Sequence, residues 1–170
     1  MTSHPQRLNI HIDDTYGPSA GWGADIPGHL EAVVRSVFKH VSPCMGTDDG
    51  YDLSIVLADN ARVRELNATY RGKNKPTNVL SFENDQPPFP EEPVYLGDII
   101  IAVPIILQEA KEQKKQPLDH LTHMVVHGVL HLYGLDHLSP EEAEIMENLE
   151  IRILNTLNIA NPYEELERPT

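Results

Sequence analysis

The chain has 170 residues, of which 40% are hydrophobic and 23% are charged, a composition that is ordinary for one folded domain with a real core. Its net charge of −13 argues against a protein that binds nucleic acid over its whole surface, because phosphate contacts need Lys and Arg. No apolar run approaches the roughly 20 residues of a membrane span, and no secretory signal is apparent. Because the single Cys44 cannot form an internal disulfide either, we expect a soluble cytoplasmic protein.

Hydrophobic periodicity predicts one α+β domain over residues 1–170, with a small mixed β-sheet packed against about five helices in the order β-α-β-α-β-β-α-α-α. Strands are predicted at residues 7–12, 51–57, 78–82 and 95–103, and helices at 27–41, 63–71, 104–113, 117–133 and 140–157. Two segments stay outside these elements. They are an irregular excursion rich in Pro and acidic residues at 84–93 and a frayed polar tail at 163–170.

Local signals support several of the helix boundaries. Asp59 or Asn60 could cap the second helix. Ser139 and Glu142 form a capping box, with Pro140 at the first helical position, which predicts a helix start there. The core-facing side of that last helix is expected to consist of Ile145, Met146, Leu149, Ile153 and Leu157.

The most informative stretch runs from His120 to His137, with the sequence HLTHMVVHGVLHLYGLDH. His127 and His131 are four residues apart and therefore lie on the same face of a helix. Gly134 suits the helix end, where a left-handed residue turns the chain and could bring His137 round as a third ligand. Three protein ligands with an open fourth position are typical of a catalytic zinc rather than of a structural one.

The alternative to a metal site is that these histidines are ordinary core or surface groups. A single pair of histidines at this spacing is a weak signal. Three histidines around a helix-ending glycine are much harder to explain by packing, and they indicate a metal site at His127, His131 and His137. His120 and His123 lie on the same helical face, but for them we favour roles in packing or in supporting the ligands.

The spacing H-x3-H-x2-G-x2-H is also the ligand framework of the metzincin proteases. Those enzymes carry a Glu general base directly after the first His, and here that position is Gly128. Because such a group contributes roughly 10²–10⁴-fold, its absence argues against peptide hydrolysis. Asp136 is the nearest acidic residue. It could be a general base, but a turn residue or a group that orients a ligand is the favoured interpretation.

The charge is unevenly distributed along the chain. Residues 62–75 have a local balance of +4, whereas residues 138–170 have a balance of −6. A polyanion would therefore have to bind at the basic segment, residues 62–75. Arg71 lies in this segment, and its guanidinium offers a planar fork of donors that matches phosphate oxygens. The residues alone leave this role open, because the same charges would also suit a solvated loop.

Two separated blocks closely resemble the signature of the bacterial YbeY family of endoribonucleases and rRNA maturation factors. One block is HGVLHLYGLDH at residues 127–137, preceded by His123 and Val126, and the other is LNATYRGKNKPTNVLSF at residues 66–82. The LGDI motif at residues 96–99 and the acidic helix after the histidines also fall where that family has them. The resemblance covers residues 51–163, and the first fifty residues match only as a generic strand and helix.

The resemblance implies a zinc-dependent, single-strand-specific endoribonuclease with a zincin-like fold. It also implies a role in ribosome quality control and in rRNA maturation, notably at the 3′ end of the small-subunit RNA. By the resemblance His127, His131 and His137 become the ligands of one zinc ion, and Arg71 becomes the functional arginine near the metal. The implied partners are single-stranded ribosomal RNA, the small ribosomal subunit and ribosome-assembly proteins, namely a GTPase and a small-subunit ribosomal protein.

Two departures from the family pattern leave the ligands untouched. Glu83 stands where the family often has Pro, and the excursion at 84–93 is longer than in many members, so added negative charge could alter how RNA approaches. Two other functions remain as alternatives. One is a metalloprotease-like or other metallohydrolase, and the other is a non-catalytic ribosome-assembly adaptor with a structural zinc.

Overall fold

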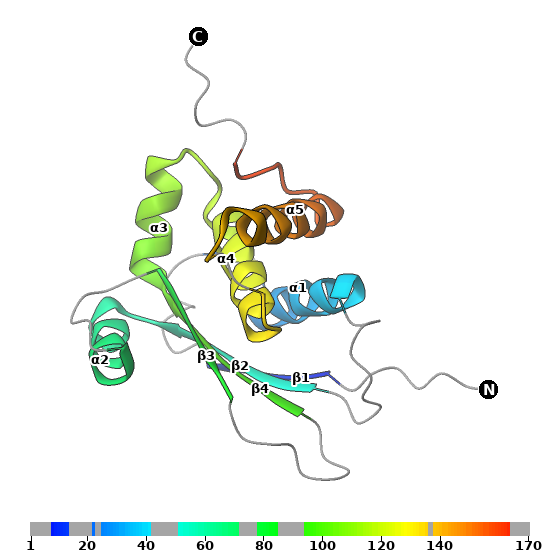
Figure 1. Cartoon of the computed structure of the whole chain (residues 1–170). Helices are drawn as coiled ribbons and strands as arrows, with labels where there is room; N and C mark the ends of the chain where they lie inside the picture. Colours follow the sequence, from blue (N-terminus) through cyan, green and yellow to red (C-terminus); the bar gives the residue numbers. More distant parts are fainter. Residues whose placement is uncertain are drawn as a thin grey trace.

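Strands and helices alternate along the chain and build a mixed sheet with helices packed against both of its faces (Figure 1). The computed structural model describes residues 8–13, 22, 25–41, 51–71, 78–84, 94–135 and 138–163. In chain order its elements are β1 (Leu8–Asp13), α1 (Ile26–Val41), β2 (Tyr51–Ala58), α2 (Asn60–Arg71), β3 (Val79–Glu83), β4 (Val94–Ala102), α3 (Val103–Glu112), α4 (Pro117–Leu132) and α5 (Pro140–Thr156). Within this described part, the predicted element order and the α+β class are confirmed.

The sheet has the strand order β1-β2-β4-β3. β1, β2 and β4 run parallel to one another, and β3 runs antiparallel to β4 with Val79 opposite Ile101 and Glu83 opposite Gly97. A helix that connects two strands returns the chain to the same end of the sheet, which is why β1 and β2, joined through α1, are parallel. The result is a mixed sheet, as predicted, with β3 beside β4 and next to α4.

Two apolar clusters cover the two faces of the sheet. Successive residues of a strand point to opposite faces, and β4 shows this directly. Ile99 and Ile101 belong to the larger cluster, which includes residues of α1, α4 and α5, whereas Ile100 and Ala102 belong to a smaller cluster with Val63 of α2. β4 is therefore buried on both faces, which explains why its sequence is a nearly continuous apolar run.

Side-chain caps fix the starts of two helices. The Ser139 hydroxyl accepts a hydrogen bond from the Glu142 backbone N–H at 3.2 Å, so α5 begins at the predicted capping box. Of the two candidates at the start of α2, Asp59 is the cap, because its Oδ1 accepts a hydrogen bond from the Arg62 backbone N–H at 2.8 Å. Both caps satisfy backbone donors that the first turn of a helix leaves unpaired.

The buried side of α5 agrees with the predicted one only in part. Met146, Glu150, Ile153 and Leu154 are buried, whereas Ile145 is 56% exposed. The prediction is confirmed for Met146 and Ile153, which are buried, and for Leu149 and Leu157, which are partly buried against the core. It is wrong for Ile145, and it left out Leu154 and, because it counted apolar residues alone, Glu150. A glutamate can occupy a buried position when hydrogen bonds compensate for the loss of water, and Glu150 has such partners.

α4 is the helix around which the others pack. Eleven of its sixteen residues are buried, and it contacts α1, α3, α5, β3 and β4 (Figure 1). It ends as predicted, because Gly134 has a φ of +108° and the Leu135 N–H donates to the Leu130 carbonyl at 3.0 Å. None of the described helices is both long enough and apolar enough to cross a membrane.

Two predicted segments lie almost wholly outside the described residues. Only Asn84 is described in the excursion at 84–93, and only Tyr163 in the tail at 163–170. Both residues make hydrogen bonds. Asn84 Nδ2 donates to the carbonyl of Tyr95 at 2.9 Å, and the Tyr163 hydroxyl donates to Glu150 at 2.6 Å. Tyr163 is thus fixed by a hydrogen bond to α5 and does not belong to a frayed tail.

Candidate active site

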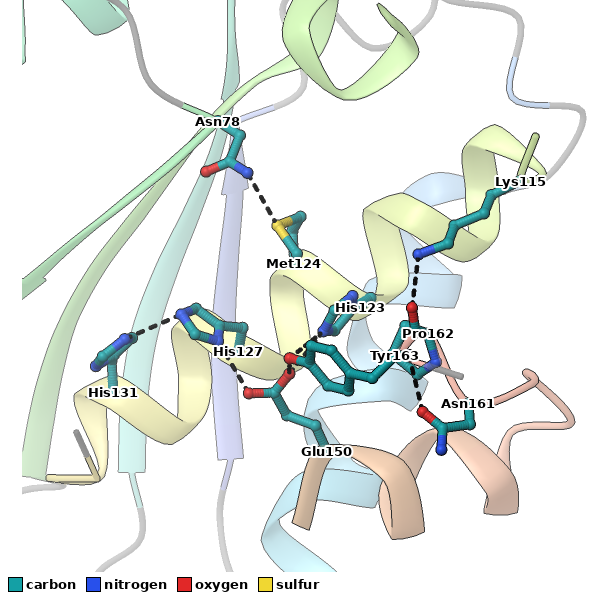
Figure 2. Close-up of polar contacts among 10 residues, drawn as sticks. All are labelled: Asn78, Lys115, His123, Met124, His127, His131, Glu150, Asn161, Pro162 and Tyr163. Atoms are coloured by element: carbon teal, nitrogen blue, oxygen red, sulfur yellow. Dashed lines mark hydrogen bonds and ion pairs between the residues drawn. The ribbon is translucent and has the colours of Figure 1, made fainter. Parts of the chain in front are cut away.

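His127 and His131 face each other from successive turns of α4 (Figure 2). Their Nε2 atoms are 3.0 Å apart, and their ring centroids are 4.5 Å apart. The spacing of four residues thus brings two imidazole nitrogens to one point. The His127 side chain is 21% exposed, so the pair can be reached from solvent.

A buried glutamate from α5 fixes the orientation of His127. The Glu150 side chain is 1% exposed, and its Oε2 accepts a hydrogen bond from His127 Nδ1 at 2.9 Å. An ionised carboxylate can only accept, so the Nδ1 of His127 carries a hydrogen, and in the neutral imidazole the lone pair is then on Nε2, the atom that faces His131. Carboxylates commonly hold metal-binding imidazoles in this way.

The other oxygen of Glu150 is also hydrogen-bonded. Oε1 accepts from His123 Nε2 and from the Tyr163 hydroxyl, each at 2.6 Å. Burial by itself raises the pKa of Glu150, but the hydrogen bonds from His123, His127 and Tyr163 outweigh burial and lower this pKa to about 2. Glu150 is therefore ionised at neutral pH. Burial, together with the hydrogen bond to this carboxylate, raises the pKa of Tyr163.

A second contact between a histidine and a carboxylate lies nearer the start of α4. His120 Nε2 donates to Glu109 Oε1 of α3 at 2.8 Å, and Asn78 Nδ2 donates to the same oxygen at 3.2 Å. Burial lowers the pKa of His120, although the hydrogen bond to Glu109 opposes this, so the imidazole is neutral at pH 7. His120 and His123 thus both bind a carboxylate of a neighbouring helix, which agrees with the supporting roles favoured from the sequence.

The remaining predicted site residues lie outside the described part of the structure. This applies to His137 and Asp136, and to the side chain of Arg71, whose backbone is the last residue of α2. Within the described ranges, no three His, Cys, Asp or Glu side chains form a group that could hold a metal ion. The structure brings together two of the three predicted ligands, His127 and His131, and the third stays a prediction.

The donor pair suits a metal ion such as zinc. Zinc–nitrogen bonds of about 2.0–2.1 Å at a tetrahedral angle place two ligand nitrogens roughly 3.3 Å apart. The observed separation of His127 and His131 Nε2 is 3.0 Å, which is close to this value. Neutral imidazole is a common zinc ligand, and His127 already has the tautomer that a ligand through Nε2 needs.

The position after the first histidine has little room for the general base of a metalloprotease. Gly128 is buried against β4, so that an added Cβ would lie 3.0 Å from Ile99 Cγ2. The Gly128 carbonyl also accepts a hydrogen bond from Ser81 Oγ at 3.4 Å, which joins α4 to β3. This close approach of helix and sheet disfavours a Glu at position 128, where the metzincin proteases carry their general base.

Among the described residues near the site, the sequence interpretation missed Glu150 and Tyr163. Glu150 had a detectable signal, because it lies four residues after Met146 and three before Ile153, within the apolar stripe of α5. An acidic residue at such a position needs a partner. Tyr163 had no comparable signal, since it follows the helix and lies in a polar segment.

The fold and the paired imidazoles define a small α+β protein with a histidine-based site on its central helix. A solution structure of a protein from Thermotoga maritima has a similar fold, with a TM-score of 0.56 and 22% sequence identity. The match covers 96% of this chain and 100% of that chain. At this level of identity the likeness shows the fold alone.

Sequence comparison identifies the family. The family model described as endoribonuclease YbeY matches residues 22–158. Relatives named endoribonuclease YbeY include that of Dichelobacter nodosus, 53% identical over 70% of this chain and 76% of the relative. The relative from Acinetobacter baumannii is 47% identical over 80% of this chain and 86% of the relative. The relative from Rhodospirillum rubrum is 42% identical over 99% of this chain and 86% of the relative. The chain belongs to the endoribonuclease YbeY family, as its two sequence blocks predicted.

Proposed function

We propose that the chain is a zinc-dependent, single-strand-specific endoribonuclease that hydrolyses RNA phosphodiester bonds during rRNA maturation. Membership in the endoribonuclease YbeY family supports the RNA-cleaving activity and its place in rRNA processing. The structural observation that carries the proposal is the pair formed by His127 and His131, with Nε2 atoms 3.0 Å apart and the tautomer of His127 fixed by Glu150.

The proposed zinc ligands are His127, His131 and His137. When bound, the ion would supply Lewis-acid chemistry toward a phosphoryl oxygen. Glu150 holds a proton at His127 Nδ1, which keeps the lone pair of that imidazole on Nε2. Because the His127 side chain is 21% exposed, a phosphodiester could approach the pair from solvent.

Arg71 is the proposed phosphate-binding residue, and it lies in the basic segment 62–75. Its guanidinium would bind two oxygens of the scissile phosphate and stabilise the charge of the transition state. The net charge of −13 disfavours RNA elsewhere on the surface. We therefore propose that partners in the cytoplasm supply much of the specificity, namely the small ribosomal subunit, an assembly GTPase and a small-subunit ribosomal protein.

Metal content and RNA cleavage, measured on the same preparation, test the proposed function. We expect about one zinc per chain, as for a three-ligand site, and cleavage of a single-stranded oligoribonucleotide that stops after chelation and returns with zinc. A double-stranded RNA of the same sequence and casein should both stay intact. A zinc-loaded protein that cleaves casein and spares single-stranded RNA would overturn the proposal.

Replacing Arg71 with alanine should leave the zinc content unchanged and slow RNA cleavage roughly 10²–10³-fold, the usual loss when one transition-state donor is removed. Arg71→Lys should recover only part of the rate, because a lysine cannot form the bidentate contact. Arg152→Ala is the control, since it removes an exposed arginine from α5, and it should cleave at the wild-type rate. Wild-type cleavage by Arg71→Ala would mean that another group binds the phosphate.

A further inference from the structure

We propose that Tyr163 is a positioning residue for the metal site and that it acts through Glu150 on His127. This inference rests on the proposed function, because it takes His127 as a metal ligand. Tyr163 lies beyond the end of α5, yet its hydroxyl reaches the carboxylate that orients His127 (Figure 2). The segment that follows α5 is then part of the support of the site.

Glu150 uses its two oxygens for two different tasks. Oε2 accepts a hydrogen bond from His127 Nδ1 at 2.9 Å, and Oε1 accepts from the Tyr163 hydroxyl and His123 Nε2 at 2.6 Å each. The terminal torsion of a glutamate has a broad energy well, so the donors around it set the plane of the carboxylate. Two donors on Oε1 therefore determine the direction in which Oε2 faces His127.

Tyr163 is held by specific contacts rather than by burial, since the residue is 40% exposed. Its backbone N–H donates to Asn161 Oδ1 at 2.8 Å, and the carbonyl of the preceding Pro162 accepts from Lys115 Nζ at 3.3 Å (Figure 2). The Tyr163 ring packs edge-on against His123, with ring centroids 5.5 Å apart. These contacts of the ring and of the preceding backbone hold its hydroxyl in a defined position.

The turn after α5 directs the segment back toward α4. Asn158 has a φ of +63°, and the Ile159 N–H donates to the Leu154 carbonyl at 2.9 Å, which closes a left-handed helix end. The chain then passes the corner between α3 and α4, where Lys115 binds Pro162. The way in which α5 ends is therefore what brings Tyr163 to Glu150.

The expected effect of removing the Tyr163 hydroxyl is moderate, because His123 donates to the same oxygen. Groups that orient a metal ligand typically change metal affinity by about 10–100-fold. With His123 still in place, we expect an effect near the lower limit, about tenfold.

The first experiment measures zinc affinity by competition with a chromophoric chelator. Tyr163→Phe removes only the hydroxyl and should bind zinc about tenfold more weakly than wild type. Tyr95→Phe is the matched control, because the Tyr95 hydroxyl also donates to a carboxylate, that of Asp98 within the sheet. The control should bind zinc with wild-type affinity.

The second experiment needs no metal. Nitrogen NMR of the imidazole rings in the metal-free protein reports which nitrogen of His127 carries the hydrogen. Wild type and Tyr95→Phe should show the Nδ1–H tautomer alone, whereas Tyr163→Phe should show a mixture of the two tautomers. A purely structural role of Tyr163 would not change this signature.

The possible outcomes separate the inference from the proposed function. Unchanged zinc affinity and an unchanged His127 tautomer in Tyr163→Phe would overturn the positioning role and leave the proposed function intact. An equal loss of affinity in both tyrosine variants would also overturn it, because the loss would then reflect general destabilisation. If wild type binds no zinc, the proposed function fails, and the tautomer measurement alone decides whether Tyr163 sets the state of His127.

Discussion

Replacing His131 with alanine is expected to empty the metal site and to stop RNA cleavage. His127 and His131 supply two nitrogens that are 3.0 Å apart, and the variant removes one of them. Loss of a ligand should reduce zinc affinity by more than the roughly 10–100-fold caused by loss of a group that merely orients a ligand. Elemental analysis gives the zinc content, and cleavage of a single-stranded oligoribonucleotide gives the activity of the same sample.

His11→Ala is a suitable control for the His131 variant, because it removes an exposed histidine from β1. The control should keep both zinc and activity. His131 is a cleaner target than His127, since truncation of His127 would also remove a hydrogen bond to Glu150. A His131→Ala protein that retains its zinc and cleaves RNA at the wild-type rate would show that His131 is not a ligand and would overturn the proposed site.

Replacing Glu150 with alanine is expected to lower the free energy of unfolding of the metal-free protein by about 1–3 kcal/mol for each buried donor that loses its acceptor. The Glu150 side chain is 1% exposed and accepts hydrogen bonds from His123, His127 and Tyr163. Its removal leaves these donors without their shared acceptor at a place where little water can replace it.

Urea unfolding at several pH values measures the free energy of unfolding of both proteins and tests whether the difference depends on the ionised Glu150 carboxylate. Folding lowers the pKa of Glu150 from its ordinary value of 4.5 to about 2, so its contribution to stability is present above pH 4.5 and is lost as the pH falls toward 2. The difference between wild type and Glu150→Ala should therefore shrink over this window. Glu144→Ala removes an exposed glutamate of α5 and should unfold like wild type, and equal stabilities of the two alanine variants would contradict the argument.

Most of the fold could be predicted because its signals are local. The alternation at residues 51–57 and the three-and-four spacing at 30–41 each lie within one element, and β2 and α1 are where these patterns place them. The strand order β1-β2-β4-β3 could not be predicted from local signals, because it depends on which strands pair after a crossover connection. No local pattern around residue 79 shows that β3 pairs with β4 in the antiparallel sense.

The candidate site likewise combines contacts within one helix, which the sequence predicts, with contacts between helices, which it does not. The facing imidazoles of His127 and His131 follow from a spacing of four residues in one helix. Glu150 lies 23 residues after His127 on another helix, so their contact depends on how α5 packs against α4. The sequence indicates that a glutamate in the stripe of α5 needs a partner, but it does not indicate which one. The roles of His137 and Arg71 stay predictions.

His127 and His131 lie on α4, which has the most buried residues of the described helices. We therefore expect a bound metal ion to exchange without local unfolding of this helix. Segments that open on their own are those with few buried contacts, whereas eleven of the sixteen residues of α4 are buried, including Leu130 and Leu132 on either side of His131. Fraying of the helix would therefore be a slow route for release of an ion held by His127 and His131. Exchange should instead proceed by ligand substitution on the exposed side of the pair. A bound ion would in turn slow exchange of those α4 amide hydrogens that exchange only after the ion is released, by a factor that rises with the ratio of free ion concentration to its Kd.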